Sequence, residues 1–320
     1  REVDRDNIKL LFDSFHMAEE KSSVKSVKDN LPSIMNKGDS VEISISNVMN
    51  SNDSDITDKV TISDVTSDNA DIISVNGNTI TANGSGTAKV SFTINSDVIR
   101  EPYTVTKTVK SGVYEIVSSD TVIDVTGFEN YGTDIYRVYN SDGEYKTVTA
   151  NNGRIENTSG KESVIVPVYK FNYTNSAVSG YTLATGTYNS QAGFGLENGG
   201  TYNTNENGSL PKDNPLKADL PYGFYDITVT RKGGCRADVY ADGHQIINNT
   251  TSSGSQNRPS GTAVMNAPRM LIADGNINLT IGNTSGSNER VAYLEIAKVP
   301  DKCKKTTIWI TGDSESANYY

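Results

Sequence analysis

The chain of 320 residues is long enough for two or three domains of ordinary size. Apolar residues make up only 35% of it, and no stretch approaches the roughly 18 consecutive apolar residues of a membrane span, so we expect no membrane insertion. The net charge of -10 argues against nucleic-acid binding, because phosphate contacts need clustered Lys and Arg side chains. Asn, Ser, Thr, Gly and Tyr dominate the composition, which favours β-structure.

The only clear helical pattern lies near the start of the chain, over residues 6–20. Its apolar residues recur at helical spacing, at Ile8, Leu11, Phe12 and Phe15. Asp6 is a suitable N-cap, and we expect residues 1–29 to form a short N-terminal helical segment that either docks on the next domain or is a remnant of a preceding one. The chain begins at Arg1 with no methionine and no secretory signal, from which we expect a processed or truncated N-terminus.

Residues 30–110 alternate apolar and polar side chains, most clearly at 41–45 and 90–94, as in strands with one buried face. The pair Asn76-Gly77 predicts a hairpin turn, because both residue types accept positive φ. The stretch 67–90, which runs through this turn to a Gly-Thr-Ala strand entry, resembles bacterial Ig-like domains. The resemblance implies an Ig-like sandwich over 30–110, of a kind that serves as a spacer or adhesin.

Residues 111–166 are also rich in strand patterns, with an apolar run at 135–139 and a turn at 140–143. They form either a small β domain or an extension of one neighbour.

Residues 167–300 show strands with one core face, as where Ile227 and Val229 alternate with threonines. The stretches 169–173 and 219–230 resemble the β-sandwich that precedes the catalytic domain in rhamnogalacturonan acetylesterases, and related galactose-binding-like carbohydrate-binding modules. The resemblance implies a jelly-roll sandwich. The predicted fold class is therefore mainly β, with two or three antiparallel sandwiches and a short N-terminal helix.

Two long polar loops of this sandwich, residues 186–209 and 248–262, are candidates for sugar binding. A sugar site needs an aromatic face for the C–H surface of the ring, and amide, carboxylate or guanidinium groups for its hydroxyls. The loops supply such groups at Tyr188, Tyr202, Asn203, Asn205, Gln256, Asn257 and Arg258. Phe194, which lies between two glycines, is expected to pack under the sandwich instead.

We expect no required cofactor. Several modules of the kind that residues 167–300 resemble hold a structural calcium ion through carbonyls and carboxylates. Glu197, Asp226 and Glu295 are available for such a site, but the sequence assigns no ligand. The two cysteines, Cys235 and Cys303, exclude a disulfide-dense scaffold, and they either pair with each other or remain two thiols.

The last twenty residues, 301–320, contain an apolar run at 308–310 that is typical of a buried parallel strand. The Gly312-Asp313-Ser314 sequence that follows resembles the opening block of the GDSL (SGNH) hydrolases, closest to rhamnogalacturonan acetylesterases. The resemblance implies that Ser314 is the nucleophile, although Glu315 departs from the usual Thr or Leu. In that family the general base and further oxyanion donors follow downstream, so we expect a linker and first strand of a truncated hydrolase domain, inactive in this chain.

Two functional hypotheses follow. In the first, the chain is the non-catalytic, polysaccharide-targeting front region of a secreted carbohydrate acetylesterase, whose full-length parent is a serine esterase. It would be an extracellular, bacterial, monomeric protein that binds a pectic or hemicellulosic polysaccharide or braces the catalytic domain. The alternative is a non-enzymatic surface adhesin or spacer built of Ig-like and lectin-like sandwiches.

Overall fold

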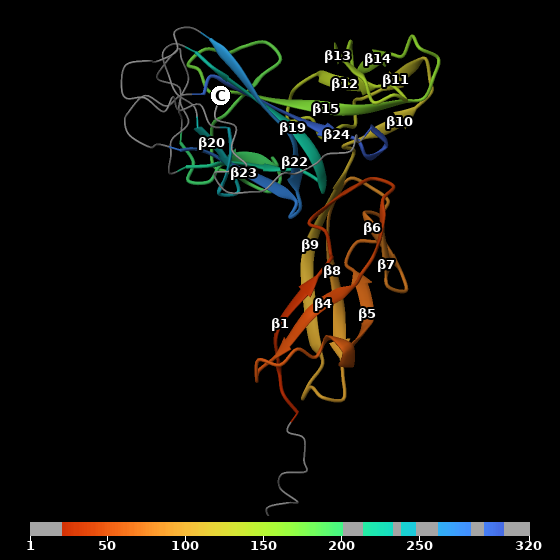
Figure 1. Cartoon of the computed structure of the whole chain (residues 1–320). Helices are drawn as coiled ribbons and strands as arrows, with labels where there is room; N and C mark the ends of the chain where they lie inside the picture. Colours follow the sequence, from red (N-terminus) through yellow and green to blue (C-terminus); the bar gives the residue numbers. More distant parts are fainter. Residues whose placement is uncertain (1–20, 201–213, 233–237, 248–261, 283–290, 304–320) are drawn as a thin grey trace, which may run out of the picture. The chain divides into compact units, whose positions relative to one another are not determined.

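The computed structural model describes residues 21–200, 214–232, 238–247, 262–282 and 291–303 (Figure 1). Within them the chain consists of strands, loops and two 3-10 turns, η1 (Thr57–Lys59) and η2 (Asp301–Cys303), which confirms the mainly β, sandwich-type fold. The helix expected over residues 6–20 lies outside the described residues. No helix in the described part of the chain is long and apolar enough to cross a membrane.

The chain divides into two compact units, Arg1–Gly112 and Val113–Tyr320. The strands of unit 1 are β1 (Val24–Asp29), β2 (Ile34–Asn36), β3 (Ser40–Glu42), β4 (Ile45–Asn50), β5 (Thr61–Ser67), β6 (Ile73–Asn76), β7 (Thr79–Ala82), β8 (Gly86–Asn95) and β9 (Tyr103–Gly112). They form a four-stranded sheet in the order β2-β9-β8-β5, a three-stranded sheet β3-β7-β6, and the pair β1-β4.

The core of unit 1 lies between its two larger sheets. The alternation predicted for residues 90–94 is confirmed, since Val90, Phe92 and Ile94 are each 0% exposed on one face of β8. They pack in one cluster with Ile73 and Ile80 of the three-stranded sheet. Burial of such side chains stabilises the fold by about 1.5–3 kcal/mol each.

Two local predictions in unit 1 need correction. Residues 41–45 are not one strand, because β3 ends at Glu42 and β4 begins at Ile45. The hairpin between β6 and β7 exists, but its two turn residues are Gly77 and Asn78, since Asn76 still pairs with Thr79. Gly77 has φ +59 while Asn78 has no positive φ, so only the glycine supplies the unusual conformation.

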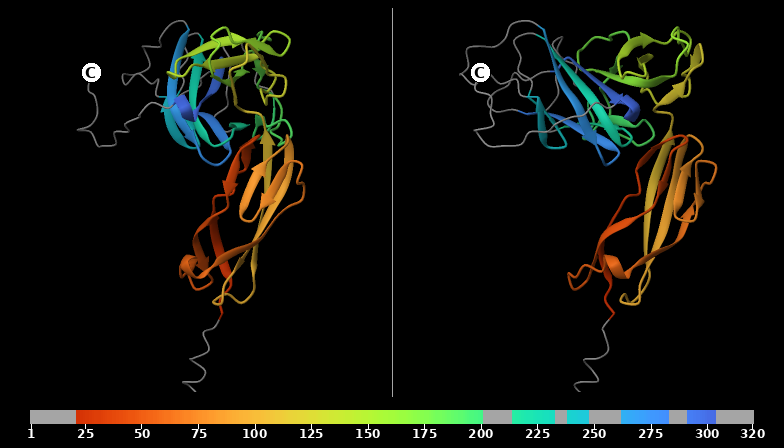
Figure 2. Two further views of the ribbon diagram at one scale, coloured as in Figure 1. Left: turned by 90° about the vertical axis from the view of Figure 1, so that its right-hand side faces the viewer. Right: turned by 45° about the vertical axis from the view of Figure 1, so that its right-hand side comes forward.

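The strands of unit 2 are β10 (Ile116–Ser118), β11 (Val122–Asp124), β12 (Ile135–Tyr139), β13 (Tyr145–Thr149), β14 (Arg154–Glu156), β15 (Ser163–Asn172), β16 (Thr182–Leu183), β17 (Phe194–Leu196), β18 (Leu216–Asp219), β19 (Gly223–Arg231), β20 (Asp238–Ala241), β21 (His244–Ile247), β22 (Ala263–Ile272), β23 (Asn276–Gly282) and β24 (Tyr293–Val299). The large sheet has the order β13-β12-β15-β24-β19-β22, with β10 and β16 paired to β15. The small sheet has the order β17-β18-β23-β20-β21, and β11 pairs with β14. Figure 2 shows β19, β22 and β24 side by side as the teal and blue ribbons of the large sheet.

Strand β15 joins the two parts of unit 2 that the sequence suggested were separate. Residues 163–167 pair with β10 and β12, and residues 168–172 pair with β24. The boundary expected between residues 166 and 167 therefore falls inside a strand that is buried along nearly its whole length. Residues 113–166 belong to the same compact unit as the residues that follow, and they also have a hydrophobic cluster of their own around Ile123, Phe128 and Ile155.

The main core of unit 2 lies between the large and small sheets. Phe171, Ile227 and Ile296 from the large sheet contact a cluster that includes Leu216 and Ile277 of the small sheet, and all five are at most 1% exposed. The opposite face of the large sheet, which we call the outer face, carries the residues that alternate with these core positions.

Candidate functional site

Tyr188 lies beside the small sheet. Its hydroxyl donates a hydrogen bond to Asp219 Oδ1 at 2.7 Å, and Lys217 Nζ lies 4.9 Å from the centre of its ring. Burial, and then the bond to Asp219, raise the pKa of Tyr188 well above its ordinary value. Gly195 has φ +150, and a side chain there would meet the Tyr188 backbone at 2.5 Å, so glycine is required for this close approach. The ring of Tyr188 is thus covered on one side and its hydroxyl is engaged.

The other site residues named from the sequence lie outside the described residues. They are Tyr202, Asn203, Asn205, Gln256, Asn257, Arg258 and Ser314. Phe194 packs inside, with ring centroids 5.3 Å from Tyr131 and 5.5 Å from Phe171, as predicted.

The outer face of the large sheet gathers aromatic and charged side chains. In β19, Ile227 and Val229 point into the core, so Asp226 and Thr228 point to the outer face. Lys232, directly after the strand, continues this alternation. Strand pairing places Ala297 and Glu295 of β24 opposite Asp226 and Thr228.

At one end of the outer face lies a group that we call the tyrosine cluster: Lys170, Tyr181, Lys232, Tyr293 and Glu295. The rings of Tyr181 and Tyr293 are 4.9 Å apart, and Lys170 Nζ lies 4.8 Å from the Tyr181 ring. Glu295 Oε1 accepts a hydrogen bond from Tyr181 at 2.5 Å and pairs with Lys170 Nζ at 2.9 Å. Lys232 Nζ donates to the Tyr293 hydroxyl at 2.6 Å. Burial, and then the bond to Glu295, raise the pKa of Tyr181, so its hydroxyl stays protonated as a donor.

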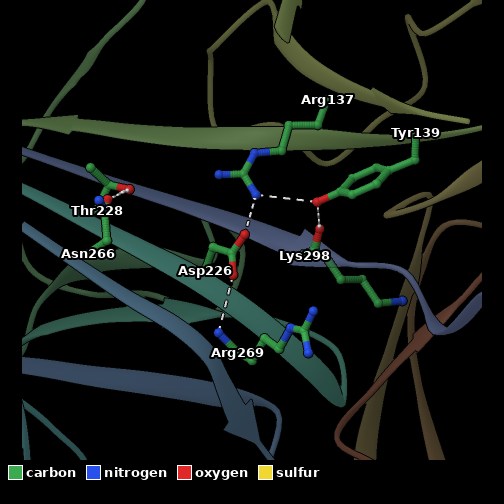
Figure 3. Close-up of polar contacts among 7 residues, drawn as sticks. All are labelled: Arg137, Tyr139, Asp226, Thr228, Asn266, Arg269 and Lys298. Atoms are coloured by element: carbon green, nitrogen blue, oxygen red, sulfur yellow. Dashed lines mark hydrogen bonds and ion pairs between the residues drawn. The ribbon is translucent and has the colours of Figure 1, made fainter. Parts of the chain in front are cut away.

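At the other end lies the arginine cluster: Arg137, Tyr139, Tyr145, Asp226 and Arg269. Arg137 Nη1 pairs with Asp226 Oδ2 at 2.6 Å and donates to the Tyr139 hydroxyl at 3.3 Å (Figure 3). The Arg137 guanidinium also stacks on Tyr145, 4.2 Å from the ring centre, and the Tyr145 side chain is 48% exposed. Burial alone would lower the pKa of Arg137, but the contacts with Tyr139 and Asp226 raise it, so the guanidinium remains charged.

Arg137 reaches Asp226 across two intervening strands. The order β12-β15-β24-β19 places β15 and β24 between them. Ala297, the residue of β24 opposite Asp226, is small and 1% exposed, which leaves room for the long arginine side chain above it.

A β-bulge fixes the second contact of Asp226. The register between β19 and β22 shifts between Tyr225 and Ile227, and Arg269 of β22 has φ +57 there. The Arg269 backbone N–H donates to Asp226 Oδ1 at 3.2 Å (Figure 3). Left-handed backbone at a residue other than glycine is costly and is concentrated at functional positions, so this bulge marks the arginine cluster as a candidate site.

Between the two clusters the outer face is polar and open. The Thr228 hydroxyl donates to Asn266 Oδ1 at 2.8 Å, and Asn266 is exposed (Figure 3). Hydroxyl and amide groups of this kind pair with sugar hydroxyls.

The structure bears on the calcium and cysteine predictions at Asp226, Glu295 and Cys303. Among the described residues, no group of three or more His, Cys, Asp or Glu side chains could hold a metal ion. Two of the three carboxylates considered for calcium, Asp226 and Glu295, are instead paired with cations. Cys303 is buried and forms no disulfide with a described residue, whereas Cys235 lies outside them.

Sequence reasoning missed the outer face as a site. It assigned Ile227 and Val229 to the core but did not follow the intervening positions Asp226, Thr228 and Lys232. The alternation itself could have indicated this site. Residues that alternate with core residues lie on the other face of the strand, and charged residues there must be exposed or paired. That Arg137 meets Asp226, 89 residues away in the chain, depends on strand order, which the sequence does not show.

Comparison with known proteins finds a relative that matches about a third of the chain. No protein-family model matches it. Over 111 residues it is 32% identical to the uncharacterized esterase YxiM of Bacillus subtilis strain 168, a match that covers 34% of this chain and 26% of that protein. The chain is distantly related to an uncharacterized bacterial esterase. It spans about a quarter of the length of that relative.

Two solved structures are also similar. The crystal structure of the B. subtilis YxiM protein has 23% identity and a TM-score of 0.30, covering 42% of this chain and 40% of that one. The CBM51-2 and INT domains of Clostridium perfringens ZmpB have 11% identity and a TM-score of 0.20, covering 86% and 47%.

Proposed function

We propose that this chain is the non-catalytic, polysaccharide-targeting front region of a secreted carbohydrate acetylesterase of the GDSL (SGNH) type. The distant relationship to an esterase and the resemblance around Ser314 support the esterase parent. In this proposal unit 1 is an Ig-like spacer, and the sandwich of unit 2 binds a pectic or hemicellulosic glycan, with or without a structural calcium ion.

The observation that carries the binding role is the tyrosine cluster. A sugar ring presents an apolar C–H surface and several hydroxyls, so it needs aromatic area beside charged or amide groups. Tyr181 and Tyr293 supply the aromatic area, and Lys170 and Glu295 supply a donor and an acceptor beside it. Tyr188 stays a proposed additional contact on the small-sheet side.

Binding should be weak and should depend on Tyr293. We expect dissociation constants on the order of micromolar to millimolar, because few stacked rings and water-competed hydrogen bonds offset the ordering of a flexible glycan. Replacing Tyr293 by alanine should remove most retention on pectic or hemicellulosic polysaccharides in affinity electrophoresis. Tyr103→Ala, which changes a half-exposed tyrosine of unit 1, is the matched control and should migrate as the unchanged protein. If the unchanged protein is retained by no polysaccharide of a broad panel, the binding role is wrong and a bracing role is favoured.

The chain should not hydrolyse acetyl esters. A serine hydroxyl without a positioned base and oxyanion donors keeps nearly its ordinary reactivity. The two histidines of these 320 residues, His16 and His244, both precede Ser314, whereas the base of the hydrolase family follows its serine. We expect the rate on a chromogenic acetate ester to equal that of buffer. Turnover that disappears in Ser314→Ala would contradict this expectation.

A further inference from the structure

The two clusters on the outer face share a composition. Each joins one carboxylate to a cation and sets a tyrosine ring against that cation: Glu295 with Lys170 and Tyr181, and Asp226 with Arg137 and Tyr145. One site would need only one such group. Two similar groups on one face indicate a ligand that repeats.

The clusters lie along one strand direction at a defined spacing. Asp226 of β19 is opposite Ala297, and Thr230 is opposite Tyr293, so Asp226 and Tyr293 are four residues apart along both strands, with Glu295 opposite Thr228 at the midpoint. At about 3.3 Å per residue the separation is about 13 Å, which exceeds the size of a single sugar ring. The polar Thr228–Asn266 pair lies between them.

In the two clusters the described cationic side chains outnumber the carboxylates. Arg137, Lys170 and Lys232 face two carboxylates, Asp226 and Glu295, and each carboxylate is already paired with one of the first two cations. Lys232 instead donates to the neutral hydroxyl of Tyr293. In a chain with a net charge of -10, a cationic group beside an aromatic pair favours an acidic ligand group.

We propose that the outer face of the large sheet binds a linear anionic polysaccharide that lies along β19 and β24 and spans both clusters. One sugar rests against Tyr181 and Tyr293 with its acidic group at Lys232. A later sugar of the same chain contacts Tyr145 beside Arg137 and Asp226, and the intervening hydroxyls meet Thr228 and Asn266. This inference rests on the proposed glycan-binding function and adds the place of the site, the charge of the ligand and its minimum length.

The test is a calorimetric titration of the whole chain with galacturonate, from the monomer to long oligomers. Chains long enough to span both clusters should bind about tenfold more tightly than the monomer, which is ~1.4 kcal/mol. Lys232→Gln should weaken oligomer binding about five- to tenfold, and Tyr145→Ala should remove the gain with length. The matched controls Lys89→Gln and Tyr103→Ala, both in unit 1, should leave every affinity unchanged, and circular dichroism of each variant checks that it folds.

Further ligands separate the explanations. A linear sulfated glycan that binds as well as the galacturonate oligomer supports the proposal with sulfate as the acidic group, and weaker binding supports it with carboxylate. Neutral galactose oligomers that bind equally, with no effect of Lys232→Gln, overturn the anionic, chain-spanning site but leave the proposed function intact. Equal binding of the galacturonate monomer and oligomers also overturns the chain-spanning site and leaves the proposed function intact.

Single-stranded DNA is the control for unspecific binding of polyanions. If it binds as tightly as the galacturonate oligomer and depends equally on Lys232, the proposal is overturned, because the face then attracts any polyanion. If no glycan of any kind binds, both the site and the proposed function fail.

Discussion

Raising the pH above about 10 should unfold unit 2 while unit 1 stays folded. In the described part of unit 2, eight tyrosines have a pKa raised above the ordinary value of 10.0, with burial as the main cause in each: Tyr114, Tyr131, Tyr136, Tyr139, Tyr169, Tyr181, Tyr188 and Tyr225. Residues 1–112 contain a single tyrosine, Tyr103, which is 38% exposed. Many buried tyrosine hydroxyls must therefore stay protonated for unit 2 to remain folded, whereas unit 1 has no buried tyrosine.

The sign of the effect follows from linkage. A raised pKa means that the native state holds its protons more tightly than the unfolded chain, so the stability from these groups is complete below pH 10 and is lost as the pH rises above it. Each such tyrosine contributes a slope of up to about 1.4 kcal/mol per pH unit. Several of them together can consume a domain stability of about 5–15 kcal/mol within one or two pH units.

Hydrogen exchange at a series of pH values would measure this transition in each unit. Peptides from β15 should lose protection above pH 10, whereas peptides from β8 should keep it. Tyr169→Phe should make the loss in unit 2 less steep, because the variant has one buried phenol fewer. If unit 1 opens first, or if Tyr169→Phe leaves the slope unchanged, buried tyrosines do not control the alkaline transition.

The local features of the fold followed from the sequence where short-range rules apply. Period-two alternation located β8 and β19. An Asp-Gly pair is typical of a two-residue hairpin turn, and Asp242-Gly243 forms that turn between β20 and β21 with φ values of 48 and 80. The one-residue error at Gly77 arose because an Asn-Gly pair fits more than one turn register.

Long-range pairing did not follow from the sequence. The long run of buried residues in β15 reads as one strand, but nothing in it shows that each half has different neighbours. The candidate site has the same origin, since Arg137 and Asp226 meet only after β15 and β24 have been placed between their strands. Such contacts depend on the order of the strands in the sheet. The same local pattern of apolar and polar residues is compatible with several strand orders, so the pattern alone does not predict the contacts.

Removing the Arg137 guanidinium should destabilise unit 2 by roughly 2–3 kcal/mol. The side chains of Arg137 and Asp226 are only 11% and 24% exposed, so the change leaves a poorly solvated carboxylate that still accepts a hydrogen bond from the Arg269 N–H at 3.2 Å. The stacking on Tyr145 is lost as well, at a cost of about 0.5–1 kcal/mol within that sum. Urea unfolding of Arg137→Ala, followed by a probe in unit 2, measures the difference.

Two further variants distinguish the ion pair from simple loss of packing. In Arg137→Met with Asp226→Leu, no buried charge is left unpaired, so most of the lost stability should return. Lys302→Ala breaks the pair between Lys302 and Glu162, whose side chains are 61% and 62% exposed, and should shift the urea midpoint very little because water screens an exposed pair. If Arg137→Ala is as mild as Lys302→Ala, the Asp226 carboxylate is solvated well enough without its partner. In that case a ligand could separate Arg137 from Asp226 at little cost in the folding free energy of unit 2.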